Sequence, residues 1–255
     1  MASTLWIGNI QFGDINVPVK LHTAVVQNRI QFHLLHKTDR VKLRQQMICK
    51  FDGAPVPAEE QAKGFQVDER KYILIDQDEL EQTEPESSRI INVHEFVKTG
   101  EIDPVFMERV YYLEPDASNK SYSALAAALK DMDAQGVCTW VMRKRAYFGA
   151  LQSAGKTLRL TVLRYTDEIV QPKSLGLESF ELSEKEVIIG SELINRLTVK
   201  FQPEKYVNEH QKKLRDMIDK KALGQKIALF TPKHHKPTTP GKLLEVLQKS
   251  LKKAA

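Results

Sequence analysis

The stretch Ile15-Asn16-Val17-Pro18-Val19-Lys20-Leu21-His22 places an aliphatic side chain at every second position, alternating with Asn16, Pro18, Lys20 and His22. Successive side chains of a β-strand point to opposite faces, so this stretch predicts a strand with one buried and one solvent-exposed face. Pro18 has no backbone N–H to donate to a neighbouring strand, which indicates a position at a sheet edge or beside a bulge. The fold therefore begins with a half-buried strand.

Other short apolar segments continue this pattern along the chain. We expect strands at Gln31–His36, Val41–Met47, Tyr72–Ile75 and Ile90–Phe96, and two more at Thr139–Phe148 and Thr157–Tyr165 that are joined by a turn around Ser153–Gly155. Many short strands separated by turn residues favour a barrel or a sandwich over a parallel α/β sheet.

Helical spacing interrupts the strands. The segment Ser121–Met132 has an apolar stripe, and Gly136 follows it as a stop signal. Ser183 with Glu186 fits a capping box, and Pro203–Leu223 is expected to be a helix that Gly224 ends. The chain is therefore expected to be mainly β, with helices concentrated near its end.

The last part of the chain divides into a linker and a tail. Residues 231–241 contain three prolines and no apolar side chain, which is typical of a linker. The segment Lys242–Ala255 returns to helical spacing, with Leu244, Leu247 and Leu251 on one face. A helix of this length is marginal alone in water, so we expect it to form by docking on a partner.

Composition limits the class of protein. The chain has 255 residues, of which 42% are hydrophobic and 28% charged, and this is enough to bury a core. No run approaches the roughly 18 apolar residues of a membrane span, and the first residues carry no secretory signal. Only Cys49 and Cys138 are present, which argues against a disulfide framework or a cysteine zinc site. We expect a soluble, cytoplasmic protein.

The net charge of +5 is a sum of segregated blocks. Residues 1–50 carry a net charge of +5, residues 51–136 carry −11, residues 137–164 carry +6, residues 165–199 carry −4 and residues 200–255 carry +9. Basic blocks are the footprint expected of a protein that binds a polyanion, chiefly nucleic acid, although charge runs are also common on ordinary solvated faces.

Three stretches resemble parts of enzyme or metal-binding motifs, and each lacks residues that the motif requires. Gly155-Lys156-Thr157 lacks the first glycine of a phosphate-binding loop, because Ala150 stands at that position, and it leads into a strand. We expect a hairpin turn there. His234-His235 has no third metal ligand nearby, and His33 and His36 have no catalytic partner at a telling spacing. We therefore expect neither an enzyme nor a cofactor.

Basic residues recur on the polar faces of the expected strands, where they could follow the phosphates of a duplex. No base-reading element such as a recognition helix is evident, so binding independent of sequence is expected. The candidate contacts are Lys20, Arg29, Lys37, Arg40, Lys42, Arg44, Arg143 and Arg145.

Several stretches, in order along most of the chain, resemble those of prokaryotic Ku proteins. They are Leu5–Gly13, Val17–Leu21, Phe32–Lys37, Val56 through Lys63–Phe65, Glu101–Pro104, Tyr111–Pro115, Leu163–Tyr165, Pro203–Tyr206 and Leu243–Leu251. Because the matches are spread over the chain, the resemblance is more specific than any single motif.

The resemblance implies a mixed α+β fold that is mainly β: a β-barrel core with an inserted bridge that closes a dimeric ring, then a C-terminal helical arm and a short tail. The expected parts are the core at residues 1–182 (bridge about 35–70, core helix about 119–133), a dimerisation arm at 183–228, a Pro-rich linker at 229–241 and a basic tail helix at 242–255.

The function implied is binding of double-stranded DNA ends by a homodimer during non-homologous end joining. The family's bridge would place Lys37–Lys50 against the duplex, which adds Lys50 to the candidate contacts. The tail would recruit and stimulate the ATP-dependent DNA ligase D through Leu243, Leu244, Leu247 and Leu251. The alternatives are a general nucleoid-coating protein without end specificity and a nuclease.

Overall fold

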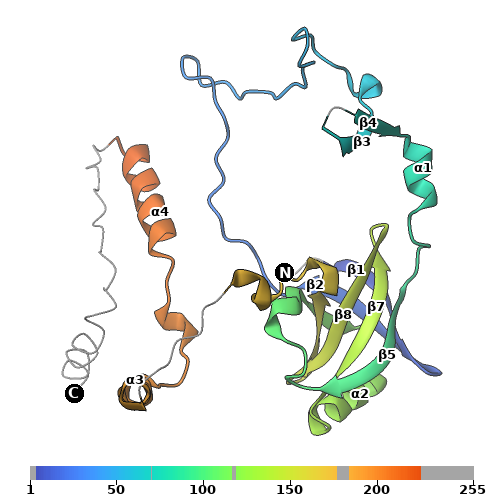
Figure 1. Cartoon of the computed structure of the whole chain (residues 1–255), viewed down its shortest axis with the longest axis vertical. Helices are drawn as coiled ribbons and strands as arrows, with labels where there is room; N and C mark the ends of the chain where they lie inside the picture. Colours follow the sequence, from blue (N-terminus) through green and yellow to red (C-terminus); the bar gives the residue numbers. More distant parts are fainter. Residues whose placement is uncertain (1–3, 70, 117–118, 177–183, 225–255) are drawn as a thin grey trace. The chain divides into compact units, whose positions relative to one another are not determined.

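The computed structural model describes residues 4–69, 71–116, 119–176 and 184–224 (Figure 1). Contacts between residues divide the chain into two units. The first contains Met1–Asn28 and His33–Pro172, and the second contains Arg29–Phe32 and the chain from Lys173 onward. We describe each unit by itself.

The first unit is built on a closed β-barrel with the strand order β1-β2-β6-β9-β8-β7-β5. Neighbouring strands are antiparallel except β1 and β5, which pair in parallel over Asn9–Gln11 and close the barrel. The strands are β1 (Thr4–Phe12), β2 (Ile15–Thr23), β5 (Ile90–Lys98), β6 (Met107–Pro115), β7 (Ala134–Met142), β8 (Arg145–Ala154) and β9 (Thr157–Leu163). The prediction of a mainly β fold with a barrel core is confirmed.

The alternation in Ile15–His22 does place one face of β2 in the barrel core. Val17, Val19 and Leu21 are fully buried there. β2 is nevertheless an interior strand of the barrel, between β1 and β6, so the prediction of an edge strand is wrong. Pro18 is tolerated because the ladder with β6 begins only at Val19, one residue later.

Helix α2 (Asn119–Asp131) covers part of the barrel through Tyr122, Leu125 and Leu129, which belong to the same buried core. The helix predicted at Ser121–Met132 is confirmed. Gly136 is not its stop signal, since it lies inside β7, where a Cβ atom would stand 2.9 Å from the Val93 side chain. Close packing between strands therefore explains this glycine.

The chain between β2 and β5, residues 24–89, forms an insertion that leaves the barrel and returns to it. It contains a two-stranded sheet of β3 (Lys63–Asp68) and β4 (Lys71–Ile75), a short helix α1 (Gln77–Gln82) and a 3₁₀ turn at Ala58–Glu60. The strand predicted at Tyr72–Ile75 is confirmed as β4. The strands predicted at Gln31–His36 and Val41–Met47 are wrong, because only isolated bridges, Leu35↔Lys42 and Ile48↔Pro55, form there.

The segment predicted as one strand, Thr139–Phe148, is in fact a hairpin. The chain reverses at Arg143-Lys144, and Met142 pairs with Arg145 across the turn. The next hairpin turns at Gly155-Lys156, as predicted, and Ala154 pairs there with Thr157. Strand β5 confirms the prediction at Ile90–Phe96, and β9 confirms most of the strand predicted at Thr157–Tyr165.

The second unit contains α3 (Glu184–Leu197), α4 (Glu209–Ala222) and a 3₁₀ turn at Pro203–Lys205. Further 3₁₀ turns lie at Pro104–Phe106 and Thr166–Glu168 in the first unit and at Pro172–Leu175, where the two units meet along the sequence. The helix predicted at Pro203–Leu223 therefore begins later, at Glu209, with Asn208 as its cap. Gly224 follows its end in the left-handed region, with φ of 75°.

Some expectations lie outside the described residues. These are the capping residue Ser183, the linker and the tail helix at Lys242–Ala255. Within the described ranges, none of the helices has the length and apolar character needed to span a bilayer.

Candidate nucleic-acid interface

Two turns of the insertion share one backbone geometry. In the first, His36 N–H donates to Val41 O and Arg40 N–H donates to His36 O, at 2.8 and 2.9 Å. In the second, Cys49 N–H donates to Ala54 O and Gly53 N–H donates to Cys49 O, at 2.8 and 2.9 Å. We call these segments, with the residues that flank them, the twin turns, residues 34–44 and 47–56. Local hydrogen bonds, rather than a sheet, therefore hold this part of the chain.

A carboxylate stabilises each twin turn. Asp39 Oδ1 accepts from Val41 N–H, and Asp52 Oδ1 accepts from Ala54 N–H, both at 3.0 Å. These backbone hydrogen bonds lower the pKa of Asp39 and of Asp52 below its ordinary value, since they favour the charged form. The carboxylates are thus occupied within the turns.

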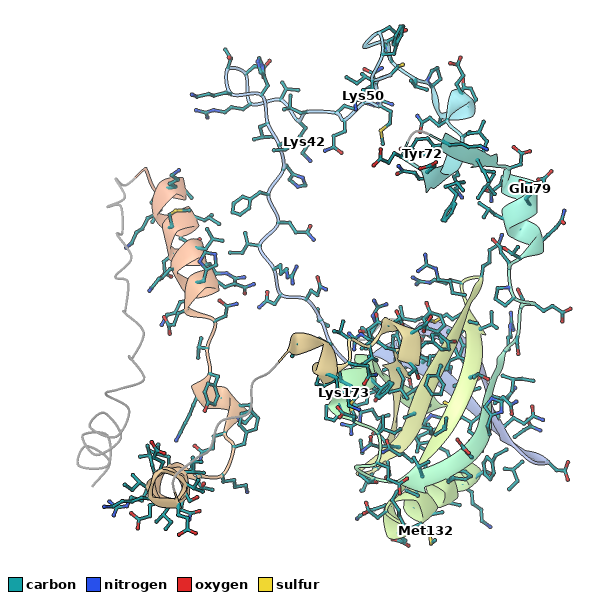
Figure 2. The ribbon with its side chains drawn as sticks, viewed as in Figure 1. Lys42, Lys50, Tyr72, Glu79, Met132 and Lys173 are labelled. Carbon is teal, nitrogen blue, oxygen red and sulfur yellow. The ribbon has the colours of Figure 1, made fainter. Side chains whose placement is uncertain are left out.

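The twin turns carry most of the basic side chains that the sequence singled out. Figure 2 shows Lys42 and Lys50 on a part of the insertion that has neither helix nor strand. These side chains are exposed, and within the part of the chain that the structure describes their charged groups form no ion pair: Lys37, Arg40, Lys42, Arg44 and Lys50. Their positive charge is available to a partner.

A second group of cations lies at the tip of the β7–β8 hairpin, where Arg143, Lys144 and Arg145 are exposed. Lys144 Nζ lies 2.8 Å from Glu84 Oε2, so an ion pair joins this tip to the last stretch of the insertion. The hydrogen bond to Glu84 raises the pKa of Lys144. Sequence reasoning missed both Lys144 and Glu84, because no glycine, asparagine or proline marks this turn.

Lys20 is placed differently from the other candidates. Its Nζ lies 2.6 Å from Asp116 Oδ1, and Glu114 faces it across the β2–β6 ladder. The hydrogen bond with Asp116 raises the pKa of Lys20. A phosphate would have to displace this carboxylate, so Lys20 is the least available of the nine residues.

The remaining candidates belong to the second unit or lie outside the described residues. Arg29 is exposed and groups with the second unit, and Leu243, Leu244, Leu247 and Leu251 lie outside the described residues. The structure therefore assembles two cationic groups, the twin turns and the β7–β8 tip.

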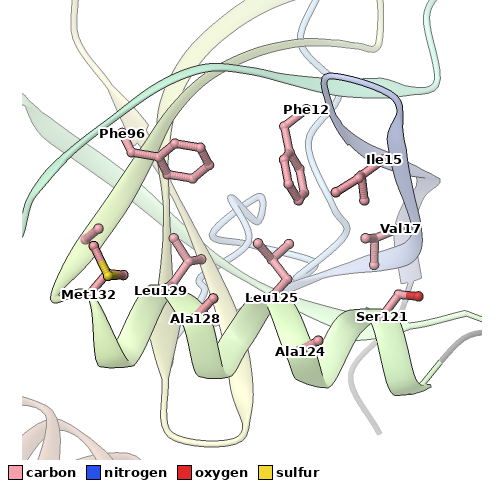
Figure 3. Close-up of a pocket in the computed structure, with 11 residues that line it drawn as sticks. Phe12, Ile15, Val17, Phe96, Ser121, Ala124, Leu125, Ala128, Leu129 and Met132 are labelled. Atoms are coloured by element: carbon pink, nitrogen blue, oxygen red, sulfur yellow. The ribbon is translucent and has the colours of Figure 1, made fainter.

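An apolar groove of about 560 Å³ lies between α2 and the barrel, lined by Phe12, Phe96, Leu125 and Met132 among others (Figure 3). The rings of Phe12 and Phe96 meet edge to face at 6.2 Å. In the described ranges, His, Cys, Asp and Glu side chains do not gather into a set of three that could hold a metal ion.

Comparison with known proteins identifies relatives over nearly the whole length. The family model "Ku70/Ku80 beta-barrel domain" matches residues 11–193. The chain is 61% identical over 252 residues to the "Non-homologous end joining protein Ku 2" of Geotalea uraniireducens (strain Rf4), covering 99% of this chain and 98% of that protein.

More distant relatives bear the same name. A "Non-homologous end joining protein Ku" of Anaeromyxobacter sp. (strain K) is 36% identical over 230 residues, which are 89% of this chain and 78% of the relative. One of Heliobacterium modesticaldum (strain ATCC 51547 / Ice1) is 36% identical over 250 residues, with 96% and 88% covered.

Proposed function

This chain belongs to the Ku family, and we propose that it binds the ends of double-stranded DNA, independently of sequence, in double-strand break repair by non-homologous end joining. The proposal rests on the names of its relatives and on one structural observation, the exposed Lys and Arg side chains of the twin turns and the β7–β8 tip, of which only Lys144 forms an ion pair among the described residues. Such side chains suit phosphates, which have the same charge at every base pair.

Dimer formation is supported by apolar side chains that the single chain leaves in water. Phe51 in the second twin turn is 98% exposed, and Val187, Ile188, Ile194 and Leu197 are exposed together on α3. Exposed apolar groups on this scale mark surfaces that bind another protein. We propose a homodimer, for which a two-fold interface is the simplest closed arrangement.

A ring would explain selection of ends. Broken ends share no sequence, so recognition has to come from phosphate charge and duplex shape, and a closed ring admits a free end but not a closed circle. A gel-shift comparison of linear and covalently closed DNA of the same sequence tests this. We expect the purified protein to bind the linear form and to leave closed circles unbound. Equal binding to both would instead identify a general nucleoid-coating protein.

The tail is the proposed contact with the ATP-dependent DNA ligase D. Deleting Lys242–Ala255 should leave the dimer intact in analytical ultracentrifugation and abolish stimulation of that ligase in a nick- or end-sealing assay. Loss of the dimer in this deletion would show that the tail belongs to the dimer interface. Replacing Leu244, Leu247 and Leu251 with Ser, while keeping the tail lysines, separates an apolar contact from a charge contact.

We propose that the protein is non-enzymatic, uses no cofactor and acts in the cytoplasm on the nucleoid. Incubation of end-labelled duplex with the protein and Mg²⁺ should leave the label on full-length strands. Shortened strands that disappear in an EDTA control would assign a nuclease activity instead.

A further inference from the structure

The β7–β8 hairpin has an unusual turn. Both residues of its two-residue loop lie in the left-handed region, with φ of 52° for Arg143 and 62° for Lys144. Turns of this kind favour Asn-Gly, because a side chain in the left-handed region crowds the backbone carbonyl. The two other two-residue hairpins of the barrel place a glycine at their left-handed position, Gly13 and Gly155. Only this tip, among the three, does without glycine.

The twin turns repeat the same contrast. Gly53 has φ of 72° in the second turn, and the equivalent residue of the first turn is Arg40, with φ of 62°. The backbone hydrogen bonds of the two turns are alike, so glycine would serve the geometry of the first turn as well as it serves the second.

Across the described residues, the non-glycine residues with positive φ are Arg40, Asp133, Arg143 and Lys144. Three of these four are basic and lie on exposed turns. Nothing in the described parts of the chain binds the guanidinium groups of Arg40 and Arg143, so no contact with a described residue compensates for the backbone cost. Strain that persists without an internal reason points to a role in binding.

Lys144 differs, because its ammonium group is paired with Glu84 at 2.8 Å. The pair ties the hairpin tip to the end of the insertion and leaves Arg143 as the unpaired cation of the turn. Lys144 is therefore better placed to position the hairpin tip than to contact a phosphate.

We infer that the basic side chains held in left-handed turns, Arg40 and Arg143, are phosphate contacts of bound duplex DNA. Lys144 positions Arg143 through its ion pair with Glu84. This inference rests on the proposed function. It distinguishes two residues from the larger set of basic residues by their left-handed backbone conformation, which the distribution of charge does not reveal.

The experiment compares thermal stability with binding to a linear duplex over a range of salt concentrations, in the full chain. Arg40→Gly and the double variant R143N/K144G replace strained residues with the ones that such turns prefer. We expect Tm to rise by about 2–4 °C for each residue relieved, as in a domain of this size. Affinity at 0.1 M salt should fall about tenfold per contact, and the slope of log K against log salt should decrease by about 1 per contact.

Two matched controls separate strain from charge. Asp133→Gly relieves the same backbone conformation and removes an anion rather than a cation, so Tm should rise and DNA affinity should not fall. Lys156→Asn removes a cation from the tip of the neighbouring hairpin, which already has Gly155, and both Tm and affinity should stay near those of the parent.

Glu84→Gln tests the positioning role by the sign of its effect. Removing a negative charge should by itself tighten DNA binding, whereas loss of the Lys144 partner should weaken it, and we expect weaker binding. Tighter binding would refute the role of Glu84 and Lys144.

Other outcomes are equally decisive. The selection of contacts is wrong if Arg40→Gly and R143N/K144G bind DNA like the parent, if K156N weakens binding as much as they do, or if they lower Tm. A parent that binds no duplex at all would overturn the proposed function, and this inference with it.

Discussion

Neutralising the first twin turn gives the most direct test of the electrostatic interface. The triple variant R40Q/K42Q/R44Q removes three exposed cations that form no ion pair in the described chain, and glutamine preserves much of the side-chain length. Arg40 remains a non-glycine residue in a left-handed position, so the backbone cost of the turn is unchanged. The variant therefore changes charge and little else.

The magnitude follows from counterion release. Each phosphate contact contributes about 0.9 to the slope of log K against log salt on B-form DNA. Three lost contacts should lower the slope by about 3, and six, if both chains of a homodimer use this turn, by about 5. At 0.1 M salt, three contacts correspond to a loss of affinity of up to about 500-fold.

Fluorescence anisotropy with a short linear duplex, repeated between 50 and 200 mM salt, measures both quantities. The parent, if about 6–10 phosphates are contacted, should lose about 10³–10⁵ in affinity over this range. The control K120Q/K130Q/K156Q changes the net charge equally at exposed positions on α2 and the β8–β9 turn. Equal slopes for the two triple variants would refute the twin turns as the interface.

Three further predictions concern the barrel that supports this surface. Tyr122→Phe should cost about 2–4 kcal/mol in urea unfolding, because the buried hydroxyl donates to Leu113 O and accepts from Leu158 N–H, and both groups would lose their partner; a cost below about 0.5 kcal/mol would contradict this account. Burial raises the pKa of Cys138 to about 12, so at pH 8 a thiol reagent should label only Cys49 in the folded chain and both cysteines after unfolding. Labelling of both in the folded state would contradict the burial. Gly149→Ala should destabilise the fold by about 1–3 kcal/mol, since a Cβ atom would lie 2.5 Å from Thr161 O and 2.7 Å from the Trp140 ring; unchanged stability would show that the strands yield.

Local periodicity was enough to predict several elements. Ile15–His22 and Ser121–Met132 have patterns in which each buried side chain matches the repeat of a strand or a helix. These elements are confirmed because the repeat depends only on backbone geometry, which neighbouring residues in sequence determine.

The same reasoning fails where apolar side chains are not buried within the chain. Val41, Leu43 and Met47 share the spacing of a strand face, yet they are exposed on the twin turns. The pattern indicates which side chains favour burial but not what buries them, and we propose that a second chain does so. The hairpin at Arg143-Lys144 was missed for another reason, since its residues are poor turn formers.

The β2 strand, the family and the segregation of charge into basic and acidic blocks could all be inferred from the order of the amino acids. Which cations of the described residues lack an ion-pair partner depends on the folded chain. Lys20 meets Asp116, and Lys144 meets Glu84, although the residues of each pair lie far apart along the chain. Ion pairing depends on separations of a few ångströms between charged groups, and the fold sets these separations. The ion pairs therefore cannot be predicted by counting charges along the sequence.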